Sequence, residues 1–133
     1  MAPENLRYTK THEWVNLEGK TARFGITDFA VKEIKDIVYI DLPPSGAAVK
    51  AGESFGAVET VKAAFDIYAP VSGTVKSANA ALAGHPETVS RDPYGEGWMV
   101  EVEAADAAKA SAEAAALMDA KAYLEHCGNG GKH

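Results

Sequence analysis

Apolar and polar residues alternate over two short stretches near the start of the chain, residues 8–15 and residues 21–26. Such alternation is typical of β-strands that bury one face. The segment Glu18-Gly19-Lys20 between them predicts a turn. We therefore expect the chain to begin with paired strands.

A short helix is expected near residue 30, because Asp28 is a favourable capping residue and apolar residues follow it at helical spacing. Residues 36–42 then carry apolar side chains on both faces of a predicted strand: Ile37 and Tyr39 on one, Val38 and Ile40 on the other. This pattern predicts a central strand, covered on both sides.

Short strand-like runs and turn signals follow one another at close intervals through the middle of the chain. The runs are residues 54–61, 64–69, 74–77 and 97–102, and the turns lie at 50–53 and 70–73. Several short strands at this spacing indicate a small β-barrel or β-sandwich.

The C-terminal part is helical in composition, since Ala104 to Ala116 is mostly alanine with acidic and basic residues. Asp119 can cap a final helix with Tyr123 and Leu124 on its apolar face. We expect one domain over residues 1–127, with its helical part at about 105–127. The glycine-rich segment 128–133 is expected to be a disordered tail.

The charge balance argues against two classes of partner. The 133 residues include 13 basic and 19 acidic ones, a net charge of −6, without a basic run of the kind that binds nucleic acid. No apolar stretch approaches the roughly 20 residues that span a bilayer. The single cysteine, Cys127, suits a reducing compartment. These features predict a cytoplasmic protein in a bacterium, or a mitochondrial matrix protein whose presequence has been removed.

The motifs of common catalytic centres are missing from the sequence. Gly95-Glu96-Gly97-Trp98 lacks the third glycine of a dinucleotide fingerprint, and no Gly-x-Ser-x-Gly elbow is present. The four histidines are scattered without metal-ligand spacing. A protein without its own catalytic residues would depend on an attached or bound group for its chemistry.

The segment Glu59-Thr60-Val61-Lys62-Ala63-Ala64 lies between two strand-like runs, so Lys62 is predicted at or near the tip of a hairpin spanning about 54–69. A lysine that an enzyme must surround and modify has to project from a tight turn, and two alanines leave space beside it. Amide formation on its amine would remove the charge and attach a cofactor permanently. A lysine in a turn is more often simply solvated, so the segment alone does not decide between these interpretations.

The chain resembles the H proteins of the glycine cleavage system, whose lipoylation motif is similar to the segment around Lys62, with Thr60 in place of a serine. Further similar blocks occur in the same order: residues 8–15, 25–28, 36–39, 68–73, 92–98 and 122–124. Two departures lie near the motif. Phe65 replaces a small polar residue, and Phe29 replaces a histidine or tyrosine.

The resemblance implies a lipoyl-type barrel-sandwich hybrid and a carrier that is not itself an enzyme. Its implied cofactor is lipoate, held as N6-lipoyl-lysine at Lys62, with Glu59 helping the lipoate-attaching enzyme to recognise the site. The implied partners are a pyridoxal-phosphate glycine decarboxylase, an aminomethyltransferase that uses tetrahydrofolate, and dihydrolipoamide dehydrogenase. We expect the loaded arm to lie near Glu13 and Asp66, whose carboxylates suit a cationic amine. Phe65 and Phe29 suit an apolar cleft instead.

Other carriers remain open as alternatives. A biotin carrier usually has methionines beside its lysine, where this chain has Val61 and Ala63. A lipoyl domain of a 2-oxo acid dehydrogenase, or an H-like protein that relays lipoyl groups, would share the attachment site. A small hydrolase or lyase using His12, Glu13 and Asp66 has little support in the sequence.

Overall fold

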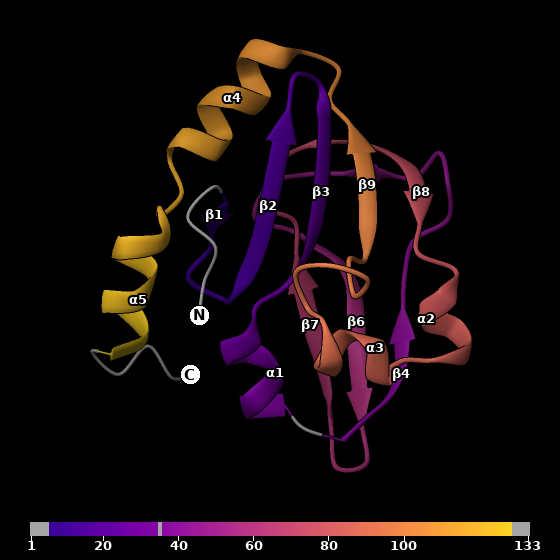
Figure 1. Ribbon diagram of the computed structural model, residues 1–133. Helices are drawn as coiled ribbons and strands as arrows, with labels where there is room; N and C mark the ends of the chain where they lie inside the picture. The colour runs from indigo at the N-terminus through magenta and orange to yellow at the C-terminus, as the bar shows by residue number, and fades with distance from the viewer. Residues whose placement is uncertain (1–5, 35, 129–133) are drawn as a thin grey trace.

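The computed structural model describes residues 6–34 and 36–128, in which two antiparallel sheets are joined by short helices (Figure 1). One sheet has six strands in the order β1-β2-β3-β9-β8-β5, and the other has three in the order β4-β6-β7. The strands of the larger sheet are Arg7–Tyr8 (β1), Glu13–Glu18 (β2), Thr21–Ile26 (β3), Val100–Glu103 (β9), Gly73–Ala78 (β8) and Ala48–Val49 (β5). Those of the smaller sheet are Ile37–Asp41 (β4), Ser54–Thr60 (β6) and Ala64–Tyr68 (β7).

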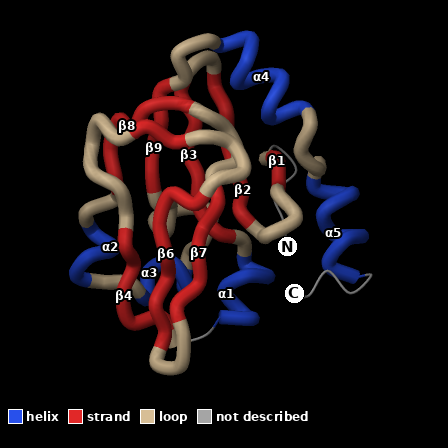
Figure 2. The backbone as a smooth tube through the Cα atoms, turned by 180° about the vertical axis from the view of Figure 1, so that it is seen from behind, coloured by secondary structure: helices blue, strands red, loops and turns tan. Residues whose placement is uncertain are grey.

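The helices lie at the ends and flanks of the sheets (Figures 1 and 2). They are Asp28–Ile34 (α1), Ala81–Gly84 (α2), Glu87–Arg91 (α3), Ala107–Ala115 (α4) and Ala120–Gly128 (α5). In both views α1 lies beside the β6–β7 hairpin, whereas α4 and α5 run along the flank formed by β1 and β2. None of the helices described is long and apolar enough to cross a membrane.

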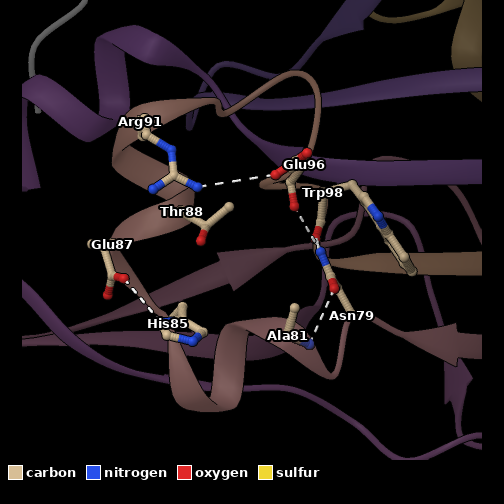
Figure 3. Close-up of a pocket in the computed structure, with 8 residues that line it drawn as sticks. All are labelled: Asn79, Ala81, His85, Glu87, Thr88, Arg91, Glu96 and Trp98. Carbon is tan, nitrogen blue, oxygen red and sulfur yellow. Dashed lines mark hydrogen bonds and ion pairs between the residues drawn. The ribbon is translucent and has the colours of Figure 1, made fainter.

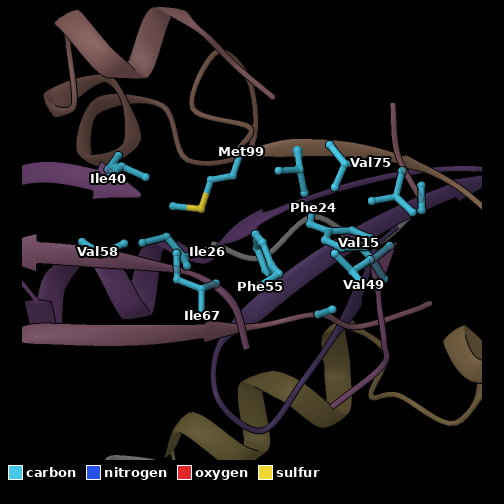
Figure 4. Close-up of a cluster of buried hydrophobic side chains, with 14 of the residues drawn as sticks. Val15, Phe24, Ile26, Ile40, Val49, Phe55, Val58, Ile67, Val75 and Met99 are labelled. Atoms are coloured by element: carbon cyan, nitrogen blue, oxygen red, sulfur yellow. The ribbon is translucent and has the colours of Figure 1, made fainter. Parts of the chain in front are cut away.

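The main core lies between the two sheets and is aliphatic, with two phenylalanines at its centre (Figure 4). Phe24 of β3 meets Phe55 of β6 edge to face, with ring centroids 5.6 Å apart. A smaller second cluster lies under α5 and holds Leu6, Tyr8, Trp14, Ala120 and Tyr123.

The strand predicted over residues 8–15 is interrupted. The chain turns back between β1 and β2, which pair antiparallel with Tyr8 opposite Trp14. His12 closes this turn with a φ of 75°, an uncommon conformation for a residue other than glycine. The polar run from Thr9 to Thr11 forms the turn, so the prediction of one continuous strand was wrong.

The prediction of a central strand over 36–42 was also wrong, because β4 is an edge strand of the smaller sheet. Its pairing with β6 shifts between Ile37 and Tyr39, which makes Val38 the extra residue of a β-bulge. The bulge breaks the alternation of faces, so Val38 and Tyr39 are 54% and 49% exposed while Ile37 and Ile40 remain buried.

Other predicted elements occur with shifted ends. The last strand, expected from Gly97, begins at Val100, because the Asn79 side-chain amide donates to the carbonyls of Glu96 and Trp98 and holds that segment in a loop. The helix near residue 30 is present, but Thr27 rather than Asp28 accepts from the Ala30 N–H at its start. The helices α2 and α3 were not predicted.

Both C-terminal helices are confirmed and both begin at an aspartate cap. The Asp106 carboxylate accepts from the N–H groups of Ala108 and Lys109, and Asp119 accepts from that of Ala122. Tyr123 is buried as expected, but Leu124 is 46% exposed and does not belong to the packed face. Gly128, expected in the tail, is the last residue of α5, and the rest of the predicted tail lies outside the described residues.

Candidate functional site

The β6–β7 hairpin ends in a turn that the Thr60 side chain holds closed. The Thr60 N–H donates to the Ala63 carbonyl at 2.8 Å. The Thr60 hydroxyl oxygen lies 3.2 Å from the Lys62 N and 3.1 Å from the Ala63 N, and accepts from both. A serine hydroxyl could make the same contacts, which gives a physical reason why threonine can stand at this position.

Lys62 lies at the tip of this hairpin and is exposed, as the sequence predicts. Ala63 and Ala64 beside it are exposed as well, so small side chains surround the amine. Lys62 forms no ion pair with any residue in the described ranges. The β6–β7 turn projects at one end of the molecule (Figures 1 and 2), so the exposed lysine is open to an enzyme that approaches the end of the hairpin.

Glu59 is exposed on β6, directly opposite Ala64 of β7 and Tyr39 of β4. Its side chain projects from the outer face of the smaller sheet, because its neighbour Val58 is fully buried on the inner face. Glu59 thus lies on the surface that an enzyme approaching Lys62 would meet.

A cleft of about 450 Å³ opens beside the hairpin, between the free edge of β7, helix α1 and the turn that precedes β2. The residues that define its character are Thr11, Glu13, Ile34, Phe65, Asp66 and Tyr68. The structure therefore brings Glu13 and Asp66 together in one cleft, although they are far apart in the sequence.

Glu13 is 2% exposed, and its carboxylate joins the turn to the edge of β7. One oxygen accepts from the hydroxyls of Thr9 and Thr11, and the other accepts from the Tyr68 N–H at 3.1 Å. Burial raises the pKa of Glu13 above its ordinary value, and these hydrogen bonds oppose the rise. The sequence gives a signal for this arrangement in retrospect, because Thr9, Thr11 and Glu13 alternate.

Asp66 is exposed on β7, in contrast to Glu13, and with Glu33 of α1 it is one of two exposed carboxylates that line the cleft. Phe65 is 40% exposed and lines the cleft, as expected. Phe29 does not line it, because its ring packs 4.7 Å from the ring of His12 and against the second hydrophobic cluster. The expectation that Phe29 makes the cleft apolar was wrong.

His12, which the sequence indicated only for the hydrolase or lyase alternative, also lines the cleft. It is 1% exposed, and its Nδ1 lies 2.7 Å from the Tyr123 hydroxyl of α5. The Tyr123 hydroxyl also lies 2.7 Å from the Thr27 hydroxyl. A buried contact between two residues more than a hundred positions apart leaves no periodic signal in a sequence.

A second pocket, of about 480 Å³, lies between α2, α3 and the loop before β9 (Figure 3). Its polar side chains pair with one another: His85 with Glu87 at 3.2 Å and Arg91 with Glu96 at 4.0 Å. The Arg91–Glu96 pair and the Asn79 amide hold the loop before β9 in place.

Comparison with known proteins gives one consistent result. Residues 6–129 match the model of the family "Glycine cleavage H-protein". The glycine cleavage system H protein of Mycobacterium avium is 51% identical over 122 residues, which cover 91% of this chain and 92% of the relative. That of Opitutus terrae is 54% identical over 111 residues, or 83% of this chain and 87% of the relative.

The crystal structure of a glycine cleavage system H protein from Mycobacterium marinum is similar over 96% of this chain and 99% of that one, with a TM-score of 0.84 and 34% identity. The predicted mainly β, lipoyl-type barrel-sandwich fold is thereby confirmed. With its fold, its lysine hairpin and this similarity along most of its length, the chain belongs to the glycine cleavage H-protein family.

Proposed function

We propose that this protein is a non-catalytic carrier of the glycine cleavage system and that lipoate is attached through an amide to the Lys62 amine. The observation that carries the proposal is the exposed lysine at the tip of a hairpin whose turn is closed by Thr60. An amide at this position buries no charge and disturbs no ion pair, so the residues present fit the group.

Three enzymes would meet the attached arm in turn: a pyridoxal-phosphate glycine decarboxylase, an aminomethyltransferase and dihydrolipoamide dehydrogenase. The lipoyl group, when attached, supplies the sulfur atoms that accept an aminomethyl group and that are reoxidised as a dithiol after its transfer. The chain's own residues supply the position of the arm and a place for it between encounters.

The cleft beside β7 is the proposed resting place of the loaded arm. Phe65 and Ile34 give it apolar walls that exclude water, and Asp66 offers a carboxylate to a cationic amine. Glu13 is already bound to three donors, so we propose that it acts mainly by fixing the cleft wall through Tyr68. Of the two carboxylates that the sequence singles out, Asp66 is then the one that contacts the arm.

Labelling of the chain by a purified lipoate ligase tests the attachment site. The intact mass of the wild type should rise by one lipoyl group, and peptide mapping should place it on Lys62. Lys62→Arg keeps the charge but offers no amine that the ligase can acylate, so its mass should not change. Modification of Lys50 or Lys76 in the wild type would overturn the assignment.

The cleft is tested by loading the arm with the decarboxylase and timing the release of ammonia in the absence of the transferase. Asp66→Asn should speed the release several-fold, because it removes a charge-assisted hydrogen bond worth about 1.5–3 kcal/mol when shielded and less in this open cleft. Glu13→Gln should also speed the release of ammonia, because it weakens the contact with Tyr68 that fixes the cleft wall.

Glu53→Gln is the matched control for these two variants, because Glu53 is exposed in the turn before β6 and does not line the cleft. Decay at the wild-type rate in the Glu13→Gln, Asp66→Asn double variant would remove both carboxylates from the proposed site.

A further inference from the structure

Exposed large apolar side chains gather at the hairpin end of the smaller sheet. Of the five such residues among those described, Val38, Tyr39, Val61 and Phe65 belong to β4, to β7 or to the turn between β6 and β7, and Leu124 lies on α5. Val61, beside Lys62, is 75% exposed. Phe65 lies opposite the buried Val58 and faces the cleft, whereas Val38, Tyr39 and Val61 are exposed outside it. A group of exposed apolar side chains marks an interaction site more often than scattered single ones do.

The register of the strands places these side chains relative to Lys62. Tyr39, Glu59 and Ala64 lie directly opposite one another across the three strands, on the outer face. Asp41, Ala57 and Asp66 form the next row on that face. Tyr39 is thus next to Glu59, which is three residues before the lysine, and the bulge at Val38 adds a further apolar side chain at the rim.

The same face has a consistent charge. The three strands contain the acidic residues Asp41, Glu59 and Asp66 and no lysine or arginine. All three carboxylates are exposed and lie on the outer face, around Tyr39. A partner that fits this face must offer an apolar socket bordered by basic side chains.

We propose that the outer face of the β4–β6–β7 sheet, with Tyr39 as its apolar anchor and Asp41 and Glu59 as its acidic contacts, docks the enzyme that attaches lipoate to Lys62. This inference rests on the proposed function. The attaching enzyme must enclose the lysine side chain itself, so it must lie against the surface around the hairpin tip. The partners of the carrier cycle act at the far end of the attached arm and have no such requirement.

The two sides of the hairpin then have different tasks. The cleft along the free edge of β7 receives the loaded arm, and the outer face, which extends from β7 to β4, receives the attaching enzyme (Figure 2). Ala64 and Asp66 border both, because they lie on the outer face and also line the cleft.

The test uses the full unmodified chain, a purified lipoate ligase, lipoate and ATP, with the intact mass as the readout. Tyr39→Ser removes the anchor and should raise the KM of the ligase for the chain about tenfold with kcat unchanged. Tyr39→Phe keeps the apolar ring and should restore the wild-type KM. Leu124→Ser is the matched control, because Leu124 is similarly exposed but lies on α5, on the opposite flank from β4 (Figure 1).

The charge contribution is tested in the same assay. Asp41→Lys should raise the KM about tenfold, and the KM of the wild type should rise as salt increases from about 0.05 to about 0.5 M. Glu18→Lys is the control, since Glu18 ends β2 at the opposite end of the molecule from the hairpin tip (Figure 1). Circular dichroism should show the same fold in every variant.

Equal KM values for the wild type, Tyr39→Ser and Asp41→Lys would overturn the docking face while leaving Lys62 as the attachment site. Normal lipoylation of these variants with a raised KM at the decarboxylase would also overturn it, since the face would then serve a partner of the cycle. A wild-type chain that gains no lipoyl group at Lys62 would instead overturn the proposed function.

Discussion

At the scale of single residues, the side chain of Trp14 determines which residue can stand opposite it. Its indole is 1% exposed, and its Nε1 donates to the Pro93 carbonyl at 3.0 Å. The ring lies over Gly25, the residue opposite it on β3, so closely that only a glycine fits. The pair therefore joins β2, β3 and the loop before β9 next to the cleft wall.

Gly25→Ala should lower the free energy of unfolding by about 1–3 kcal/mol, as expected for overpacking a filled site. The reason is steric, because a Cβ at Gly25 would lie 2.8–2.9 Å from three atoms of the Trp14 ring. Urea denaturation measures the change. Gly84→Ala is the matched control, because no heavy atom lies within 4 Å of a Cβ there and the residue is in α2. Equal stability of both variants would contradict the steric argument.

At the scale of the element, the β6–β7 hairpin shows why the position of the lysine in the turn matters and not only its presence. The turn is defined over four residues, from Thr60 to Ala63, and both central side chains are exposed. The two positions are nevertheless not equivalent in the turn, because the Thr60 hydroxyl accepts from the N–H of Lys62 and of Ala63 but not from that of Val61.

Exchange of the two residues, Val61→Lys with Lys62→Val, should leave the fold intact and lower the rate of lipoylation on the order of a hundredfold. A misplaced reacting group commonly loses that much rate even when it remains accessible. Mass spectrometry measures the modification and circular dichroism the fold. Val61→Ala with Lys62 retained is the control and should be labelled far faster than the exchanged chain. Full labelling of the exchanged chain would show that the ligase tolerates either position.

Elements with a local signal were predictable from the sequence. The hairpin, the strand from Thr21 to Ile26 and the two aspartate-capped C-terminal helices follow from alternation, alanine content and caps within a few residues. The bulge at Val38 was not predictable, because it depends on the pairing of β4 with β6. Helices as short as α2 and α3 carry too few residues to show a period.

The part of the site that lies on the hairpin was predictable from the sequence, whereas the part that comes from other elements was not. Lys62, Glu59 and Asp66 lie on or next to one hairpin, so a local motif identifies their neighbourhood. Glu13 reaches that neighbourhood only through the four-residue turn between β1 and β2 and the pairing of those strands. A family resemblance rather than a pattern of residues placed it there. Its hydrogen bond to the Tyr68 N–H became evident only in three dimensions.

The whole molecule is organised around two hydrophobic clusters that have different tasks. The main cluster lies between the sheets and supports the hairpin, whereas the second cluster attaches α5 to β1 and to the turn before β2. Burial raises the pKa of Tyr123, so its hydroxyl stays neutral and remains hydrogen-bonded with His12 and Thr27. This hydroxyl links the C-terminal helix to the cleft wall.

Tyr123→Phe should lower the free energy of unfolding by about 1–3 kcal/mol, because two buried groups lose their hydrogen bond while the ring stays in place. Thermal denaturation measures the loss. Tyr39→Phe removes the hydroxyl of an exposed tyrosine and should change stability by less than about 0.5 kcal/mol. Both variants should be lipoylated at the wild-type rate. A Tyr123→Phe chain as stable as the wild type would mean that the hydroxyl contributes no net stability.

The Glu13 carboxylate has one more consequence, which concerns self-association. The smaller sheet has two edge strands, and exposed strand edges can pair with a second molecule and seed aggregation. On β7 the Tyr68 N–H, which would otherwise be offered to another strand, is occupied by a buried acid, and on β4 a bulge interrupts the regular ladder. The end of the molecule that must stay apolar and accessible for its partners is thus protected against polymerisation along its strands.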